Sequence, residues 1–153
     1  MGRISNNSPY FYFKKKDMIK KLISGKFIQE TPDLAILVLR VSIGLLMLTH
    51  GIPKLNMLLS GEIQFPGLFG MPPALSLFLA VFAELFCSIL LIFGLATRLA
   101  TIPLFFTMAV AAFVVHANDP FSQKELALLY LLSYVVIFIH GSGKYAIDKI
   151  LSK

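Results

Sequence analysis

Long apolar segments separated by short polar ones fill the chain from residue 33 onward. They predict helices over residues 33–50, 73–95 and 98–116, and a fourth helix that ends near Ile139. Each approaches the roughly 20 residues that a helix needs to cross the hydrocarbon core of a bilayer. The pattern therefore predicts an all-α membrane protein, a bundle of four transmembrane helices.

Helix-breaking and capping residues mark the predicted ends of these helices. Residues 51–53 (Gly-Ile-Pro) loosen or end the first helix, although residues 54–59 can continue it as a kinked turn. Residues 60–73 are rich in glycine and proline and form a loop whose apolar side chains should fold back onto the bundle. Thr97 can cap the third helix, and residues 122–125 (Ser-Gln-Lys-Glu) have the spacing of a capping box that opens the fourth.

The segment before the first spanning helix is basic. Over residues 17–27, apolar positions recur at helical spacing, with lysines around the other face. This is typical of an amphipathic helix on an anionic membrane surface, although a solvated basic tail that only orients insertion explains it equally well. No continuous apolar core of a cleaved signal peptide precedes residue 31, so the first spanning helix should act as the targeting signal. We predict a basic amphipathic segment (1–32), a four-helix domain (33–148) and a basic tail (149–153).

Composition and charge support membrane insertion and predict its direction. The 153 residues are 57% hydrophobic and 14% charged, with a mean hydropathy of +0.79. Of the 14 basic residues, seven precede residue 27, one lies between the second and third predicted helices, and three lie in the tail. Both termini should therefore be cytoplasmic in a bacterial inner membrane, with residues 51–73 and 117–123 outside. The net charge of +6 then reports topology and lipid contact rather than nucleic-acid binding.

Cysteine content limits the redox chemistry that the chain can perform by itself. Cys87 is its single cysteine, which excludes an internal disulfide, a Cys-x-x-Cys pair, a c-type haem attachment and a four-cysteine iron–sulfur site. We expect Cys87 to be a small packing residue.

The most informative residue is Glu84, a carboxylate in the middle of the second apolar segment. A charge at that depth costs at least about 2.5 kcal/mol, so it is either paired or used. Counted from the outer ends of helices at His50 and Pro73, Arg40 and Glu84 lie at the same depth, about 15 Å down at 1.5 Å per residue. We predict an ion pair between Arg40 and Glu84, which either organises a site or only fixes the register of the helices.

Ionisable residues also gather in the predicted outer half of the bundle. They are candidates for a polar pocket that opens outward, with Glu84 as a proton carrier and with ligand contacts from Arg40, His50, Lys54, Glu84, His116 and Asp119, near Glu125. His50 and His116 could ligate a metal or a haem, but two histidines on separate helices are a weak signal, and we predict no metal. Hydrogen bonding to the carbonyl oxygens of a quinone suits them better. Capping of helices and loops is the third interpretation.

These residues resemble a known family. The segment R-x-x-x-G-x-x-x-x-x-H-G-x-x-K-L from Arg40 to Leu55, then Glu84 and the turn F-G-L-A-T-R-L-A, are similar to the DoxX family of small four-helix membrane proteins. The segment H-A-N-D-P-F from His116 is similar to one subgroup of it. The resemblance covers residues 33–148. It implies a link to membrane redox chemistry, since a related type belongs to a thiosulfate:quinone oxidoreductase and some members associate with superoxide-detoxifying or sulfur-transferring partners.

Two functions stay open at this point. The chain is a membrane component of a redox system that binds a quinone or similar ligand, or it is a non-catalytic accessory or assembly subunit of a larger membrane complex. The partners expected are lipids, other membrane or periplasmic proteins and a second copy of the chain, not nucleic acid. No self-contained catalytic motif is present, so an enzymatic role would be that of a subunit. Solute transport is less favoured, since paired broken helices are not evident.

Overall fold

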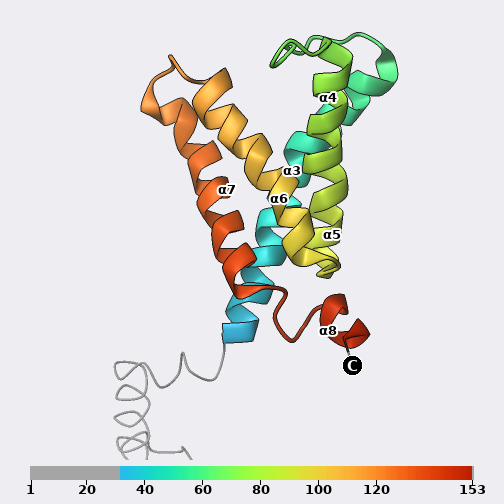
Figure 1. Ribbon diagram of the computed structural model, residues 1–153, viewed down its shortest axis with the longest axis vertical. Helices are drawn as coiled ribbons and strands as arrows, with labels where there is room; N and C mark the ends of the chain where they lie inside the picture. Colours follow the sequence, from blue (N-terminus) through green and yellow to red (C-terminus); the bar gives the residue numbers. More distant parts are fainter. Residues whose placement is uncertain (1–31, 153) are drawn as a thin grey trace, which may run out of the picture. The chain divides into compact units, whose positions relative to one another are not determined.

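The computed structural model describes residues 32–152, which are helical wherever they are regular (Figure 1). The chain order is α3 (Pro32–Ser60), α4 (Pro73–Val81), η1 (Phe82–Cys87), α5 (Ser88–Phe93), α6 (Thr97–Val110), η2 (Ala111–Val115), α7 (Phe121–His140) and α8 (Ile147–Leu151). The segments η1 and η2 are π-helical: η1 joins α4 to α5 without a break, and η2 continues α6 and ends at the turn that begins with His116. The predicted interfacial helix over residues 17–27 lies outside the described residues.

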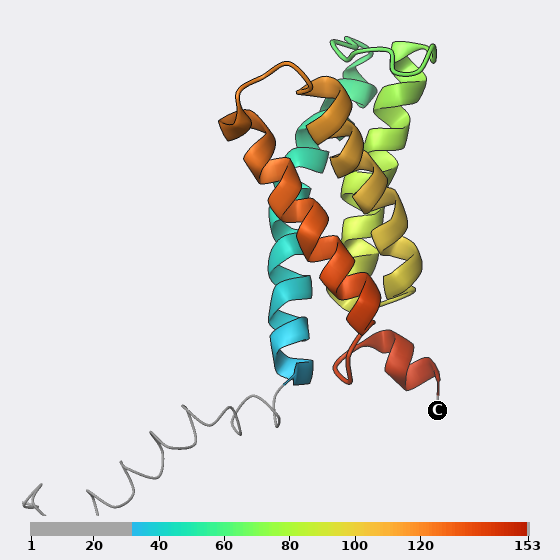
Figure 2. The same cartoon turned by 60° about the vertical axis from the view of Figure 1, so that its left-hand side comes forward.

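These elements form four membrane-spanning helices within the described residues, as predicted. Residues 32–152 contain four helices long and apolar enough to cross a membrane: Pro32–Ser60, Pro73–Phe93, Thr97–Val115 and Phe121–His140. They run side by side, with the start of α3 and the end of α7 at one end of the bundle (Figures 1 and 2). The loops 61–72 and 116–120 lie at the other end. We call these the α8 end and the loop end.

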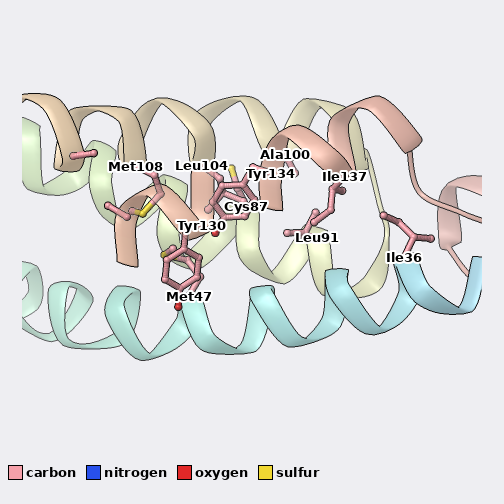
Figure 3. Packing of buried hydrophobic residues seen from close by; sticks show 12 residues of the cluster. Ile36, Met47, Cys87, Leu91, Ala100, Leu104, Met108, Tyr130, Tyr134 and Ile137 are labelled. Carbon is pink, nitrogen blue, oxygen red and sulfur yellow. The ribbon is translucent and has the colours of Figure 1, made fainter. Parts of the chain in front are cut away.

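The distribution of polar and apolar side chains is that of a membrane protein. Leu91, Leu104 and Ile137 pack with the ring of Tyr134 in the interior (Figure 3). Large apolar side chains also cover the outside of all four spans. The polar side chains buried between the helices are Arg40, Ser76, Glu84, Ser88, Thr97 and Thr101. An apolar exterior around a partly polar interior is the arrangement expected when the helices are surrounded by lipid hydrocarbon. The chain is therefore a multi-pass membrane protein.

The first helix is longer than predicted. It continues through Pro53 to Ser60, whereas the sequence favoured an end near His50. Pro53 removes one backbone donor, a loss that membrane helices tolerate when neighbouring elements support the turn. Support comes from Gly51, since a Cβ there would lie 2.9 Å from the carbonyl carbon of Glu84. Close packing of α3 on η1 thus holds the helix where proline would otherwise loosen it.

Two predicted caps are also wrong. Thr97 does not cap α6, because Ala96 occupies the N-cap position and the Thr97 hydroxyl donates to Asp148 instead. The predicted capping box is not formed either, because α7 begins at Phe121, directly after Pro120. A proline with its fixed φ begins a helix readily, so the start lies ahead of residues 122–125. The end of the second spanning helix at Phe93, followed by left-handed Gly94, agrees with the prediction to within two residues.

Candidate functional site

A cavity of about 430 Å³ lies at the loop end, between the second and third spanning helices. The loop 61–72 contributes part of its wall, which confirms that this loop folds back onto the bundle. Most of the lining is apolar, and the polar groups in it are few. The lining residues are Lys54, Phe65, Pro66, Leu68, Phe69, Met71, Ser76, Leu79, Ala80, Glu84, Phe106, Thr107, Val110, Ala111, Val115 and His116.

Glu84 and Lys54 form an ion pair in this cavity. The Lys54 ammonium group donates a short hydrogen bond to Oε1 of Glu84. The Glu84 side chain is 1% exposed, while that of Lys54 is 27% exposed. The second carboxylate oxygen, Oε2, is buried and has no hydrogen-bond partner within residues 32–152. A buried carboxylate oxygen without a partner is rare, and it marks a position where a ligand or a water can donate.

Both π-helical segments border the cavity. Glu84 lies inside η1, and η2 ends directly before His116. A π-helical turn inserts one extra residue and is frequent at functional sites. His116 Nδ1 is 2.7 Å from Oδ2 of Asp119, so this aspartate orients a histidine that lines the cavity. Asp119 itself is not among the lining residues.

The loop 61–72 is held against the bundle by hydrogen bonds and by a cation–π contact. The Leu68 amide donates to the hydroxyl of buried Ser76 over 3.1 Å. The Met71 amide donates to the carbonyl of Leu68, which closes a turn in the loop. The ammonium of Lys54 lies 5.9 Å from the centre of the Phe65 ring. Lys54 therefore connects the loop and Glu84.

The predicted ion pair between Arg40 and Glu84 is wrong. The Arg40 guanidinium donates to the carbonyls of Ser142 and Tyr145 at the α8 end, over 3.2 and 2.9 Å. Because α3 continues to Ser60, Arg40 lies about 21 Å along the helix from Lys54, at 1.5 Å per residue. The depth comparison used His50 as the outer end, and this placed the wrong cation level with Glu84.

Arg40 belongs instead to a cluster that ties the chain's last residues to the bundle. The Asp148 carboxylate accepts hydrogen bonds from the amides of Ala96 and Thr97 over 2.7 and 2.9 Å, and from the Thr97 hydroxyl. Burial raises the pKa of Asp148, but these hydrogen bonds and the charge of Arg40 outweigh it, so its pKa lies below its ordinary value. Gly94 leaves room for the guanidinium, because a Cβ there would lie 1.6 Å from Nη1 of Arg40.

The remaining predicted residues are divided between the cavity and its surroundings. The structure brings Lys54, Glu84 and His116 together in the cavity wall. His50 is exposed, and its ring meets that of Tyr130 edge to face at 5.8 Å, outside the cavity lining. Glu125 is exposed on α7. Within residues 32–152, no three histidine, cysteine or carboxylate side chains gather as a metal site would require.

Sequence reasoning predicted the contribution of the loop 61–72 to the apolar wall of the cavity but missed the contribution of the helices. On α4 and η1 the lining residues Ala80 and Glu84 are four apart, and on α6 Phe106 and Val110 have the same spacing. That spacing places each pair on one helix face, so the two stripes could have been found by following Glu84 along its own face. Nothing in the pattern shows that these two faces meet each other.

Comparison with known proteins identifies the family. The DoxX family model matches residues 35–117, which include every polar residue of the cavity. The chain belongs to the DoxX family. A relative from Bacillus subtilis (strain 168), named "Putative oxidoreductase CatD", is 32% identical over 122 residues, or 79% of this chain and 90% of the relative.

A second DoxX relative carries no functional name. It is an "Uncharacterized protein" from Haemophilus influenzae, 31% identical over 99 residues, which are 60% of this chain and 66% of the relative. No solved structure matches the chain significantly.

Proposed function

We propose that this DoxX protein is a component of a membrane redox system and that its loop-end cavity binds the head group of a quinone. The observation that carries the proposal is the unpartnered oxygen of Glu84, buried in a mostly apolar cavity beside the ammonium of Lys54. The redox assignment is supported by the CatD relative, whose printed name is that of an oxidoreductase.

The size and lining of the cavity suit such a ligand. Small-molecule sites commonly enclose roughly 300 to 1,000 Å³ and combine apolar walls with a few polar groups. A cavity of about 430 Å³ falls in that range. From Phe106 to His116 the lining extends ten residues along the third spanning helix, or about 15 Å at 1.5 Å per residue. The length accommodates a ring together with the first part of an isoprenoid chain.

The polar groups have complementary roles toward a quinone and its reduced form. Lys54 can donate to a carbonyl oxygen of the ring, and Oε2 of Glu84 can accept from a hydroxyl group of the hydroquinone. Reduction of a bound quinone consumes two electrons and two protons. Glu84 and the histidine His116 are placed to exchange the protons, while the electrons come from a redox partner. The chain thus acts as a subunit rather than as a self-contained enzyme.

A titration with a short-chain quinone tests the proposal. The full chain in lipid nanodiscs, kept under reducing conditions, should bind the hydroquinone form of a soluble ubiquinone analogue saturably, as measured by isothermal titration calorimetry. The reduced form is used because its hydroxyl groups can donate to Glu84 and also accept from Lys54. Lys54→Met and Glu84→Gln should each weaken binding about tenfold, the equivalent of one charge-assisted hydrogen bond. His116→Ala should weaken it less, because its ring lies at the end of the lining.

Matched controls exist on α7. Lys124→Met and Glu125→Gln make the same chemical changes at the loop end but outside the cavity lining. Both should bind the analogue as the natural chain does. Binding that is absent, or that is equally strong in the Glu84 and Glu125 variants, would refute the quinone site.

The topology belongs to the same proposal. We place the chain in a bacterial inner membrane with both termini cytoplasmic, because seven basic residues precede residue 27 and three close the chain. A membrane-impermeant maleimide should label a cysteine placed at Gly61 in intact spheroplasts, but not one placed at Ser152. Labelling of Ser152→Cys alone would reverse the orientation.

A non-catalytic assembly subunit is the second proposal. Phe69 in the loop 61–72 and Phe121 at the start of α7 are exposed and give the loop end an apolar surface that a periplasmic or membrane partner could cover. Gentle extraction that yields a stoichiometric protein partner with no small molecule in the cavity would favour this function over quinone binding.

A further inference from the structure

A second cavity, of about 600 Å³, lies at the α8 end, far from Glu84 and Lys54. It lies where the spanning helices end, since His140 closes α7 and Thr97 opens α6. Its lining carries more ionisable side chains than that of the loop-end cavity, four of them basic and two acidic. The lining residues are Asp33, Ala96, Thr97, Arg98, Leu99, His140, Gly141, Ser142, Gly143, Lys144, Asp148 and Lys149.

The two carboxylates in this lining are already occupied. Asp33 accepts a hydrogen bond from the Lys144 amide over 2.9 Å and pairs with the Lys144 ammonium at 3.6 Å. Both oxygens of Asp148 accept from Ala96 and Thr97. Both carboxylates in the cavity wall are therefore already engaged in contacts within the protein.

Two cations in the same wall remain without a carboxylate. Within residues 32–152, Arg98 and Lys149 form no ion pair. The guanidinium of Arg98 makes one long hydrogen bond, of 3.4 Å, to the carbonyl of Ile139 and rests against the backbone of Gly141. His140 adds a further donor. The cavity thus presents an excess of donors and positive charge to whatever enters it.

We propose that this cavity binds the phosphate group of an acidic phospholipid. A phosphate group complements the guanidinium of Arg98 and the ammonium of Lys149. The lipid source is favoured by the apolar residues next to the basic ones: Leu99, in the lining itself, is 70% exposed, and Ile150 on α8 is 72% exposed. Basic groups at the end of spanning helices, with apolar side chains beside them, match a lipid head group and its acyl chains.

Thermal unfolding in the presence of defined lipids tests the site. The full chain, stripped of lipid in an uncharged detergent, is mixed with micelles that contain phosphatidylglycerol, phosphatidylcholine or no lipid, or with inorganic phosphate. Phosphatidylglycerol should raise the unfolding temperature saturably. Phosphatidylcholine and inorganic phosphate should leave it unchanged.

The variants assign the effect to this cavity. Arg98→Gln and Lys149→Gln should each raise the half-saturating lipid concentration about tenfold. Arg98→Lys and Lys149→Arg should retain most of the affinity, and Lys124→Gln at the loop end should leave it unchanged. Lys149 has an exposed side chain without a hydrogen bond inside residues 32–152, so its variant should fold even if the Arg98 variant does not.

The comparison between variants is decisive because residues 1–31 also carry basic charge. An equal shift with phosphatidylcholine, or half-saturation unchanged in Lys149→Gln, would overturn the proposal. An equal shift with inorganic phosphate would overturn the lipid assignment.

Discussion

Replacement of Lys54 by methionine is the perturbation that most sharply probes the buried ion pair. Methionine keeps the apolar length of the side chain but removes the ammonium. Glu84, 1% exposed, then has two carboxylate oxygens without a partner. Removal of one member of a buried ion pair costs about 3 to 5 kcal/mol. Because Lys54 is 27% exposed and water already screens the pair, we expect about 3 kcal/mol, the lower end of that range.

The converse variant should be milder. Glu84→Gln leaves no buried charge, and the ammonium of Lys54 can turn toward water, so we expect a loss of about 1 kcal/mol. The double variant Lys54→Met/Glu84→Gln also contains no buried charge. Its stability should lie near that of Glu84→Gln alone, which corresponds to a coupling energy of about 2 to 3 kcal/mol.

Cys87 provides the assay. It is 2% exposed and is the chain's single cysteine, so a fluorogenic maleimide reacts with it only when the bundle opens. For a chain of this size, 1 kcal/mol corresponds to about 2 to 4 °C in the unfolding temperature. Lys54→Met should therefore unfold about 6 to 12 °C below the natural chain, and Glu84→Gln about 2 to 4 °C below it.

Glu125→Gln is the matched control for Glu84→Gln and should change stability by about 0.5 kcal/mol or less. Lys124→Met is the control for Lys54→Met; it loses one exposed hydrogen bond, to the carbonyl of Ala117, and should cost no more than about 1 kcal/mol. The reasoning is refuted if Lys54→Met is no less stable than Glu84→Gln. Additive losses in the double variant would refute it as well, because independent sites add and coupled ones do not.

Three further predictions concern single positions. The first two use the same assay, and the third uses thermal unfolding followed by circular dichroism, because a protonated thiol does not react with the maleimide in acid. Gly94→Ala should destabilise far more than Gly70→Ala: both glycines have positive φ, but a Cβ at Gly94 would collide with Arg40, whereas nothing lies within 4 Å at Gly70. Gly51→Ala should destabilise the protein, because its Cβ would push α3 away from η1. The same displacement should weaken quinone binding, as measured by the calorimetric titration. Asp148 stabilises the fold above the pKa of its unfolded form, and this contribution is lost as the pH falls through its lower folded pKa. Asp148→Asn should therefore make the free energy of unfolding depend less on pH in the acid range.

The spanning helices could be predicted because their signal is local. Hydropathy over about 20 residues, and a proline or glycine at the ends, are read directly from the chain. The residues Arg40, Gly44, Met47 and Gly51 share one face of α3, and this face is buried. The helix end at His50 was wrong, because the sequence around Pro53 does not show that Gly51 packs on the backbone of another helix.

The candidate site was harder to predict for the same reason. Glu84 was evident as a buried carboxylate, but its partner depended on the true length of α3. The helix ends at Ser60, about three turns later than the predicted end at His50, and this error placed Arg40 instead of Lys54 level with Glu84. The π-helical turns at η1 and η2 have no signature in the hydrophobic pattern, yet they set the direction of Glu84 and precede His116. Contacts such as Arg40 with Ser142 join residues more than 100 positions apart, which no local pattern reports.

The most direct test of the central claim is the small-molecule content of the protein taken gently from its own membranes. The natural chain and Glu84→Gln are extracted in parallel, with Glu125→Gln as the control, and bound molecules are identified by native mass spectrometry after release. We expect about one quinone or hydroquinone per chain in the natural protein and in the control, and its loss in Glu84→Gln. A natural chain whose cavity carries no quinone, or a quinone retained equally by all three proteins, would contradict it.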